Sequence, residues 1–157
     1  MIVVSDTSPL SYLILIEQVE VLPKLYGKVL APPAVVAELQ HVDAPATVRA
    51  WASGPPEWLQ VQAPAVACDF GMLGAGEAAA LQLAVEIGAD LVLIDERAAT
   101  IVARRNGFRT TGTLGTLILA AERNLLSLTK ALAALRRTTF RATPELLDRI
   151  EREHGPS

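Results

Sequence analysis

The sequence predicts an α/β fold in three layers, with a central, mainly parallel sheet of about five strands and helices on both faces. Short aliphatic runs alternate with longer helical segments along the 157 residues. Strands separated by helices need crossover connections, which make neighbouring strands parallel. The first and fourth runs are almost continuously apolar, as expected of strands that are buried on both faces.

The predicted strands are short runs bounded by turn residues. In chain order they are Ile2–Ser5, Val29–Ala31, Trp58–Gln62, Leu91–Ile94 and Arg109–Thr111. Hydrophobic residues make up 51% of the chain and aromatic residues only 4%, so aliphatic side chains must fill the core between these strands and the helices.

Helical segments fill the intervals between the strands. Pro33 and Pro144 suit the first turn of a helix, and Gly88 and Gly107 suit the position just after a last turn. The predicted helices are Pro9–Glu17, Val19–Tyr26, Pro33–Gln40, Ala46–Ser53, Ala75–Ile87, Glu96–Asn106, Thr113–Asn124, Ser127–Arg137 and Pro144–Glu153.

We expect a single domain over residues 1–157, whose helices from about residue 126 onward are available to contact a partner or a second copy. The apolar stretches end well short of the roughly 20 residues that span a bilayer, and no signal peptide is recognisable. The single cysteine, Cys68, can form neither an internal disulfide nor a zinc site alone. A cytoplasmic location is therefore expected.

Charge is distributed unevenly along the chain. The net charge is −3, but residues 1–96 carry −9 and residues 97–141 carry +8. The acidic half predicts a cluster of carboxylates, and the basic segment is either a surface for a polyanion or an ordinary solvated surface.

Asp6 closes the first predicted strand in the stretch VVSDTSPL. Ser8 and Pro9 can supply the N-cap and the first-turn proline of the next helix, so Asp6 is not needed as a cap. An unpaired carboxylate at a buried strand end is costly, and ligands bind at the carboxyl ends of parallel strands. We therefore predict a functional role for Asp6.

Three further acids each have an ordinary structural interpretation. Asp95 closes LVLID and is either a ligand or an N-cap, with Glu96 beside it favouring the positive end of the helix. Glu77 follows GMLGAG in a first helical turn, and these glycines lack the dinucleotide and Walker patterns. Glu38, in PPAVVAELQ, lies beside an apolar stripe and is by itself a solvated residue.

Together the four acids favour a metal site. No lysine lies near them in sequence to neutralise their repulsion, and oxygen ligands are those that hard divalent cations prefer. Mg²⁺ keeps coordination positions open for a phosphate oxygen and a water molecule. His41 and His154 stand alone, so neither a zinc site nor a histidine-activated nucleophile is predicted.

These stretches resemble the PIN-domain family (PilT N-terminal-like nucleases), which includes the toxins of VapC-type toxin–antitoxin pairs. VVSDTSPL, LAPPAVVAEL, LGAGEAAALQLA and LVLIDERAA carry the four acids in the family's order, and GFRTTGTLGTLILAAERNLL is similar to a subgroup of unassigned function. The resemblance implies a PIN-like α/β/α fold and Mg²⁺- or Mn²⁺-dependent cleavage of RNA, usually in homodimers and sometimes restrained by an antitoxin. Glu77 departs from the aspartate that many members have.

On this resemblance Asp6, Glu38, Glu77 and Asp95 are the catalytic and metal-binding residues. Their hypothesised task is to hold one or two ions that activate a water for attack on a phosphodiester. The basic segment is then expected to bind RNA phosphates, and its candidate RNA-binding residues are Arg97, Arg104, Arg105 and Arg109. Ser8 is expected either to hydrogen-bond Asp6 or to cap the helix, and Glu96 is the other expected neighbour of the site. The alternative is a non-catalytic PIN-like module that binds nucleic acid or protein; a receiver-like phosphoacceptor domain is disfavoured because the first strand ends in one acid rather than two.

Overall fold

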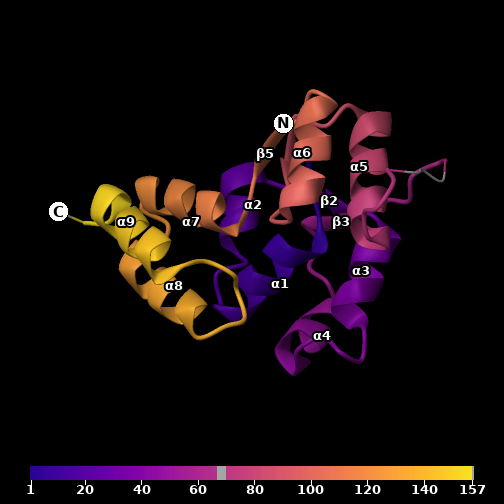
Figure 1. The fold of residues 1–157 in the computed structure, drawn as a ribbon. Helices are drawn as coiled ribbons and strands as arrows, with labels where there is room; N and C mark the ends of the chain where they lie inside the picture. Colours follow the sequence, from indigo (N-terminus) through magenta and orange to yellow (C-terminus); the bar gives the residue numbers. More distant parts are fainter. Residues whose placement is uncertain (67–69, 157) are drawn as a thin grey trace.

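The computed structural model describes residues 1–66 and 70–156, so Cys68 lies outside the described residues (Figure 1). Five strands form one sheet in the order β3-β2-β1-β4-β5, and every neighbouring pair is parallel. The strands are β1 (Val3–Ser5), β2 (Val29–Ala31), β3 (Leu59–Val61), β4 (Leu91–Leu93) and β5 (Arg109–Thr111).

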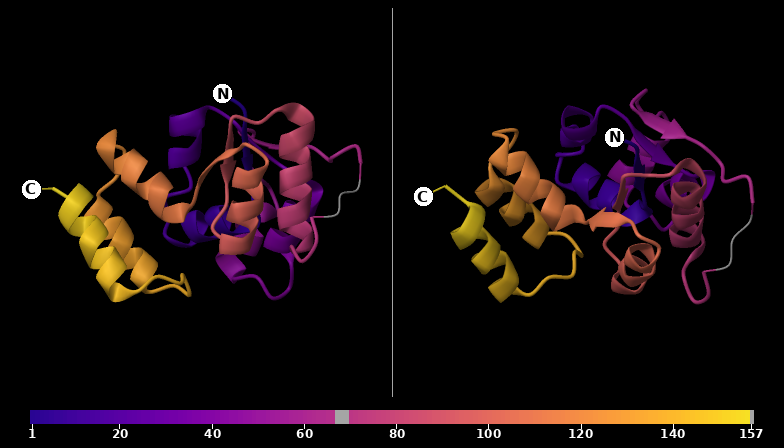
Figure 2. Two further views of the ribbon diagram at one scale, coloured as in Figure 1. Left: turned by 45° about the horizontal axis from the view of Figure 1, so that its top comes forward. Right: turned by 90° about the horizontal axis from the view of Figure 1, so that it is seen from above.

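Helices flank both faces of this sheet, which confirms the predicted three-layer architecture (Figure 2). Crossovers between parallel strands are right-handed as a rule, which assigns the helices between β1 and β2 to one face and those that follow β3 and β4 to the other. The helices are α1 (Thr7–Leu15), α2 (Val21–Tyr26), α3 (Pro33–Gln40), α4 (Ala46–Ala52), α5 (Ala75–Ile87), α6 (Arg97–Arg105), α7 (Thr113–Glu122), α8 (Leu128–Arg136) and α9 (Pro144–His154).

The strand order reverses between β1 and β4. From β1 the chain moves outward to β2 and β3, and it then returns to the other side of β1, where Val3 pairs with Leu91 and Ser5 pairs with Leu93. Just beyond β1, the Asp6 N–H donates to the Leu93 carbonyl at 2.9 Å. A parallel sheet opens a crevice at such a reversal, outside the carboxyl ends of its strands, and ligands bind there.

Aliphatic side chains fill the core, as the composition predicts. Val3 and Val4 of β1 are fully buried and belong to the same core cluster as Leu10 and Leu13 of α1. The same cluster continues into the C-terminal helices α8 and α9, which lie together at one side of the molecule (Figure 2). Their buried members are Leu128, Ala131, Leu132, Leu135, Leu147 and Ile150.

In the part of the chain that the structure describes, no helix is both long enough and apolar enough to cross a lipid bilayer. The longest, α5, has 13 residues and ends at Gly88, whose φ of 65° is a left-handed conformation that favours glycine.

Candidate functional site

Asp6 lies between β1 and α1, in extended backbone conformation with φ −81° and ψ 177°. The prediction that Ser8 is the N-cap is wrong, because α1 already begins at Thr7 and Asp6 is its N-cap residue. Pro9 is tolerated in the first helical turn since its missing N–H would have no partner in the helix there. The Asp6 side chain nevertheless makes no capping hydrogen bond.

The Asp6 carboxylate is buried and incompletely paired. Its residue is 3% exposed, and its Oδ1 has no hydrogen-bond partner among the residues that the structure describes. Burial raises its pKa from 3.8 to about 7; the backbone N–H of Thr7 opposes this rise, and the charges of Glu77, Glu38 and Asp95 add to it. The other three predicted acids therefore act on Asp6 at the carboxyl edge of the sheet.

Asp95 follows β4 directly and is tied to the helix α7 by both of its oxygens. Oδ1 accepts the Thr113 N–H at 2.7 Å, and Oδ2 accepts the Thr113 hydroxyl at 2.7 Å. Burial raises the pKa of Asp95, while these two bonds lower it. Asp95 is not the N-cap of α6, because that position belongs to Glu96.

Glu38 joins two helix starts through its carboxylate. Oε1 accepts the Gly76 N–H at 3.1 Å, and Oε2 accepts the Thr7 hydroxyl. A Cβ at position 76 would lie 2.5 Å from Oε2, so only glycine permits this approach. Glu38 is exposed to solvent on one side, yet its bonds to α1 and α5 make it more than the solvated helix residue that its sequence position alone predicts.

Glu77 closes the first turn of α5. Its Oε1 accepts the Gly74 N–H at 3.0 Å, which satisfies one of the donors that a helix start leaves free. In this structure Glu77 therefore has the ordinary role of a glutamate in a first helical turn, which is to stabilise the helix start. Its charge still acts on Asp6, whose pKa it helps to raise.

The carboxylates do not form a closed metal cage as placed. Among residues 1–66 and 70–156, no group of three or more His, Cys, Asp or Glu side chains is positioned to hold a metal ion. Asp95, Glu38 and Glu77 instead accept hydrogen bonds from nearby N–H and hydroxyl donors. The donor set still fits Mg²⁺ or Mn²⁺, because it consists of oxygens only and includes the unpartnered buried Oδ1 of Asp6.

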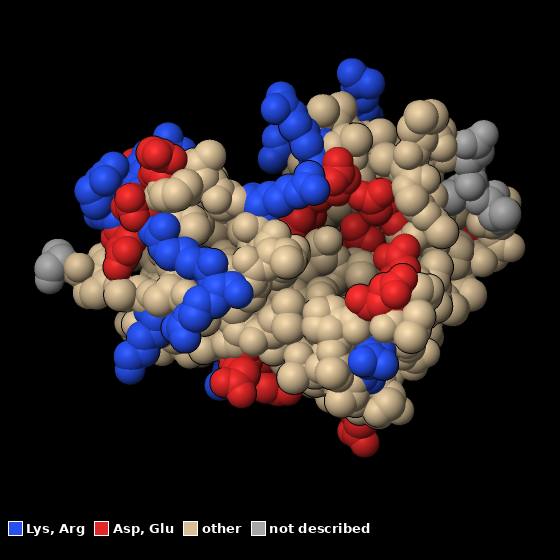
Figure 3. All heavy atoms as spheres, turned by 60° about the horizontal axis from the view of Figure 1, so that its bottom comes forward, with Lys and Arg blue, Asp and Glu red and all other residues tan. Residues whose placement is uncertain are grey.

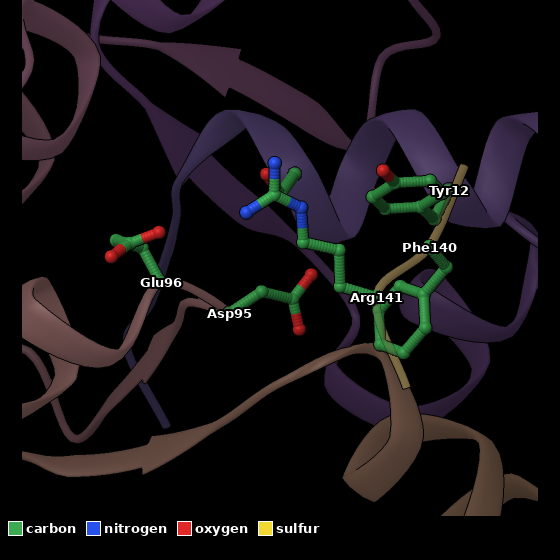
Figure 4. Close-up of a pocket in the computed structure, with 6 residues that line it drawn as sticks. Tyr12, Asp95, Glu96, Phe140 and Arg141 are labelled. Carbon is green, nitrogen blue, oxygen red and sulfur yellow. The ribbon is translucent and has the colours of Figure 1, made fainter. Parts of the chain in front are cut away.

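A cavity of about 370 Å³ opens beside Asp95, the one of the four predicted acids that lines it. Figure 3 shows acidic side chains gathered in a hollow of the surface, with basic side chains near its rim. Figure 4 shows the lining of the cavity, where Asp95 and Glu96 lie near Tyr12, Phe140 and Arg141, which come from distant segments of the chain. The lining residues are Ser8, Tyr12, Asp95, Glu96, Phe140 and Arg141.

Sequence reasoning missed several of these neighbours. Arg141 and Phe140 belong to the segment between α8 and α9, far along the chain from the four predicted acids, and no local motif marks them. The hydroxyls of Thr7 and Thr113 bind two of the acids, whereas Ser8, the hydroxyl predicted to bind Asp6, lines the cavity.

The predicted RNA-binding arginines divide between the two edges of the sheet. Arg97 is the first residue of α6, which starts at the carboxyl edge beside Asp95. Arg104 and Arg105 lie in the last turn of this nine-residue helix, about 12 Å away along its axis. Arg109 is the first residue of β5 and thus lies at the amino edge. Of the four, only Arg97 is near the acids.

Comparison with known proteins gives one positive result. A family model described as DUF3368, a PIN domain, matches residues 2–156. No curated protein and no solved structure matches the chain significantly. The matched range includes the four acids and every residue that lines the cavity.

Proposed function

The chain belongs to the PIN-domain family, and from this premise we propose that it is a Mg²⁺- or Mn²⁺-dependent endoribonuclease. PIN domains are generally nucleases that need a divalent metal ion, so the fold is of a nuclease type. Asp6 carries the proposal: a buried carboxylate with an unpartnered oxygen and a pKa of about 7 lies at the reversal of strand order, among three other acids. Such a group is typical of a functional site.

Each acid has a task in this proposal. Asp6 and Asp95, at adjacent strand ends, would hold the metal ion, and Glu38 and Glu77 would complete its shell or orient water. The bound ion supplies Lewis-acid chemistry, which neutralises phosphate charge and lowers the pKa of a water. Thr113 already fixes the orientation of Asp95, and Gly76 and Thr7 fix that of Glu38. Outer hydrogen bonds of this kind orient metal ligands.

The decisive experiment is cleavage of labelled single-stranded RNA by the purified chain in Mn²⁺, Mg²⁺ or EDTA. We expect cleavage with metal, none in EDTA, and a loss of at least about 100-fold in rate for Asp6→Asn, because the leading metal ligand loses its charge. Glu57→Gln, at an exposed acid just before β3, is the matched control and should cleave normally. Full activity in EDTA or in Asp6→Asn would refute the proposal.

A non-catalytic module that binds nucleic acid or protein is the second candidate. Two observations favour it. No three of the described acids are positioned to hold a metal ion together, and the Glu77 side chain accepts a hydrogen bond from the N-cap residue of its own helix. Calorimetry with Mn²⁺ separates the candidates. Absence of Mn²⁺ binding, together with RNA binding but no cleavage, would support the module and exclude the nuclease.

A toxin role, with a cognate antitoxin and a homodimer, extends the proposal further. Its support is the resemblance of the four acidic stretches to VapC-type toxins. Expression in bacteria should then arrest growth, and Asp6→Asn should abolish the arrest. Light scattering of the purified chain tests the dimer, for which the helices from about residue 126 are the proposed contact.

A further inference from the structure

The segment between α8 and α9 is fastened to α1 next to the acids. The Tyr12 hydroxyl lies 3.0 Å from the Thr139 hydroxyl, and the rings of Tyr12 and Phe140 meet edge to face with centroids 5.1 Å apart. Within the segment, the Phe140 N–H donates to the Thr138 hydroxyl at 3.1 Å. These contacts hold Arg141, the next residue, at the wall of the cavity.

Arg141 is the one cation among the six residues that line this cavity. No carboxylate oxygen of the described residues lies within 4.0 Å of its guanidinium nitrogens, although Asp95 and Glu96 line the same cavity. By contrast, Arg136, the last residue of α8, is paired with Asp148 at 2.7 Å. Figure 4 shows the Arg141 side chain extending across the cavity above Asp95, with Glu96 to one side and the two aromatic rings to the other.

This combination of groups suits one nucleotide of RNA. A guanidinium presents a planar set of donors that matches two phosphate oxygens, and aromatic rings provide a surface for a base or a ribose. The cavity, at about 370 Å³, is within the size range of small-ligand sites. An arginine is also the feature that an anionic substrate needs where carboxylates surround it.

We propose that Arg141, supported by Tyr12 and Phe140, forms an RNA-binding subsite in which the guanidinium holds a phosphate next to the bond that is cleaved. The C-terminal helices thereby contribute a substrate-binding residue to the site that the sheet builds. This subsite rests on the proposed ribonuclease function, but it makes a separate prediction about RNA affinity.

The test measures RNA binding by the full chain, with Ca²⁺ replacing the catalytic ion so that no turnover is needed. The probe is a short fluorescent single-stranded RNA, and the variants are Arg141→Gln, Arg141→Lys and the control Arg149→Gln, an exposed arginine of α9 outside the cavity. We expect Arg141→Gln to weaken binding by about 10- to 100-fold. The slope of log affinity against log salt should fall by about 0.7 in magnitude, the contribution of one phosphate contact. Arg141→Lys should restore part of the affinity, and Arg149→Gln should match the wild type.

Two results would overturn the subsite. One is an unchanged affinity and salt slope in Arg141→Gln. The other is faster cleavage or tighter Mn²⁺ binding in Arg141→Gln with unchanged RNA affinity, which would make Arg141 a substitute for the metal ion rather than a substrate ligand. Failure of the nuclease proposal is distinguishable, because it appears as absence of cleavage in the wild type and leaves the binding comparison intact.

Discussion

At the scale of single residues, the burial of Asp6 links folding to pH. Its pKa is about 7 in the folded chain against 3.8 for the ordinary side chain, so the folded state holds a proton that the unfolded state has lost. The stability that this proton provides is fully present below about pH 4 and is lost as the pH rises through about 7. The loss is at most ~4 kcal/mol. Asp95, whose pKa is also raised, acts in the same direction.

We therefore expect the metal-free protein to melt at a lower temperature at about pH 8 than at about pH 5. Asp6→Asn removes the titrating group and should reduce this difference, with its gain in melting temperature confined to the higher pH. Thermal denaturation followed by circular dichroism measures both, and Glu57→Gln is the control. Equal pH dependence in Asp6→Asn and the wild type would contradict the assignment.

Gly76 tests the close approach of Glu38. The Cβ of Gly76→Ala would lie 2.5 Å from the Glu38 carboxylate, so the end of the Glu38 side chain must move away and its bond to the Gly76 N–H must break. We expect a loss of about 0.5–1.5 kcal/mol in the free energy of unfolding by urea, and slower RNA cleavage. Gly54→Ala is the matched control, since a Cβ there meets nothing within 4 Å; an equal cost at both positions would count against the argument.

The four acids were predictable from the sequence, but their partners were not. Asp6 and Asp95 follow strands and Glu77 lies in a first helical turn, whereas Glu38 lies near the end of α3. The order of all four stretches, rather than any one local pattern, singled these acids out. Thr113 and Arg141 contact the site only because β5 and the α8–α9 segment return to it in space. No local pattern encodes such long-range contacts, which depend on packing of the whole chain.

At the scale of elements, the bond between Asp95 and Thr113 joins β4 to the start of α7. Thr113→Val keeps the backbone donor and the side-chain shape but removes the hydroxyl from a fully buried position. We expect a loss of about 1–3 kcal/mol in stability. Because the two Thr113 bonds lower the pKa of Asp95, the acid limb of the pH–rate profile should also move to higher pH.

Thr116→Val is the control for this substitution. Thr116 is equally buried in α7, but its hydroxyl donates to the Gly112 carbonyl at 2.8 Å rather than to an acid. It should change stability without moving the pH–rate profile. If both variants move the profile alike, Thr113 acts on the helix and not on Asp95.

Element positions were predicted closely because periodicity and end signals agree along most of the chain. Each predicted helix and strand is present, with bounds that differ by two residues or fewer. The start of α1 shows what limits such predictions. Ser8-Pro9 is a good local start signal, but pairing of β1 with β4 ends at Ser5 and leaves the chain free to turn at once.

At the scale of the whole molecule, we propose that the chain unfolds as one domain. Trp51 and Trp58 lie together, with ring centroids 5.8 Å apart, beside α4 and β3. Leu135, 1% exposed, belongs to α8 and to the same core cluster. Leu135→Ala should cost about 2–5 kcal/mol and shift the tryptophan-fluorescence and circular-dichroism transitions together. Lys130→Ala, exposed on the same helix, should shift neither, and separate transitions would indicate two domains.

The pairing of β1 with β4 also sets the order of events during synthesis. β1 leaves the ribosome before β4, the strand that pairs with it on one side and ends at Leu93, and Arg141 follows much later. Long-range parallel pairing of this kind is slow to form. On the proposed function, a half-made chain has no assembled site and cannot cleave the message from which it is being translated.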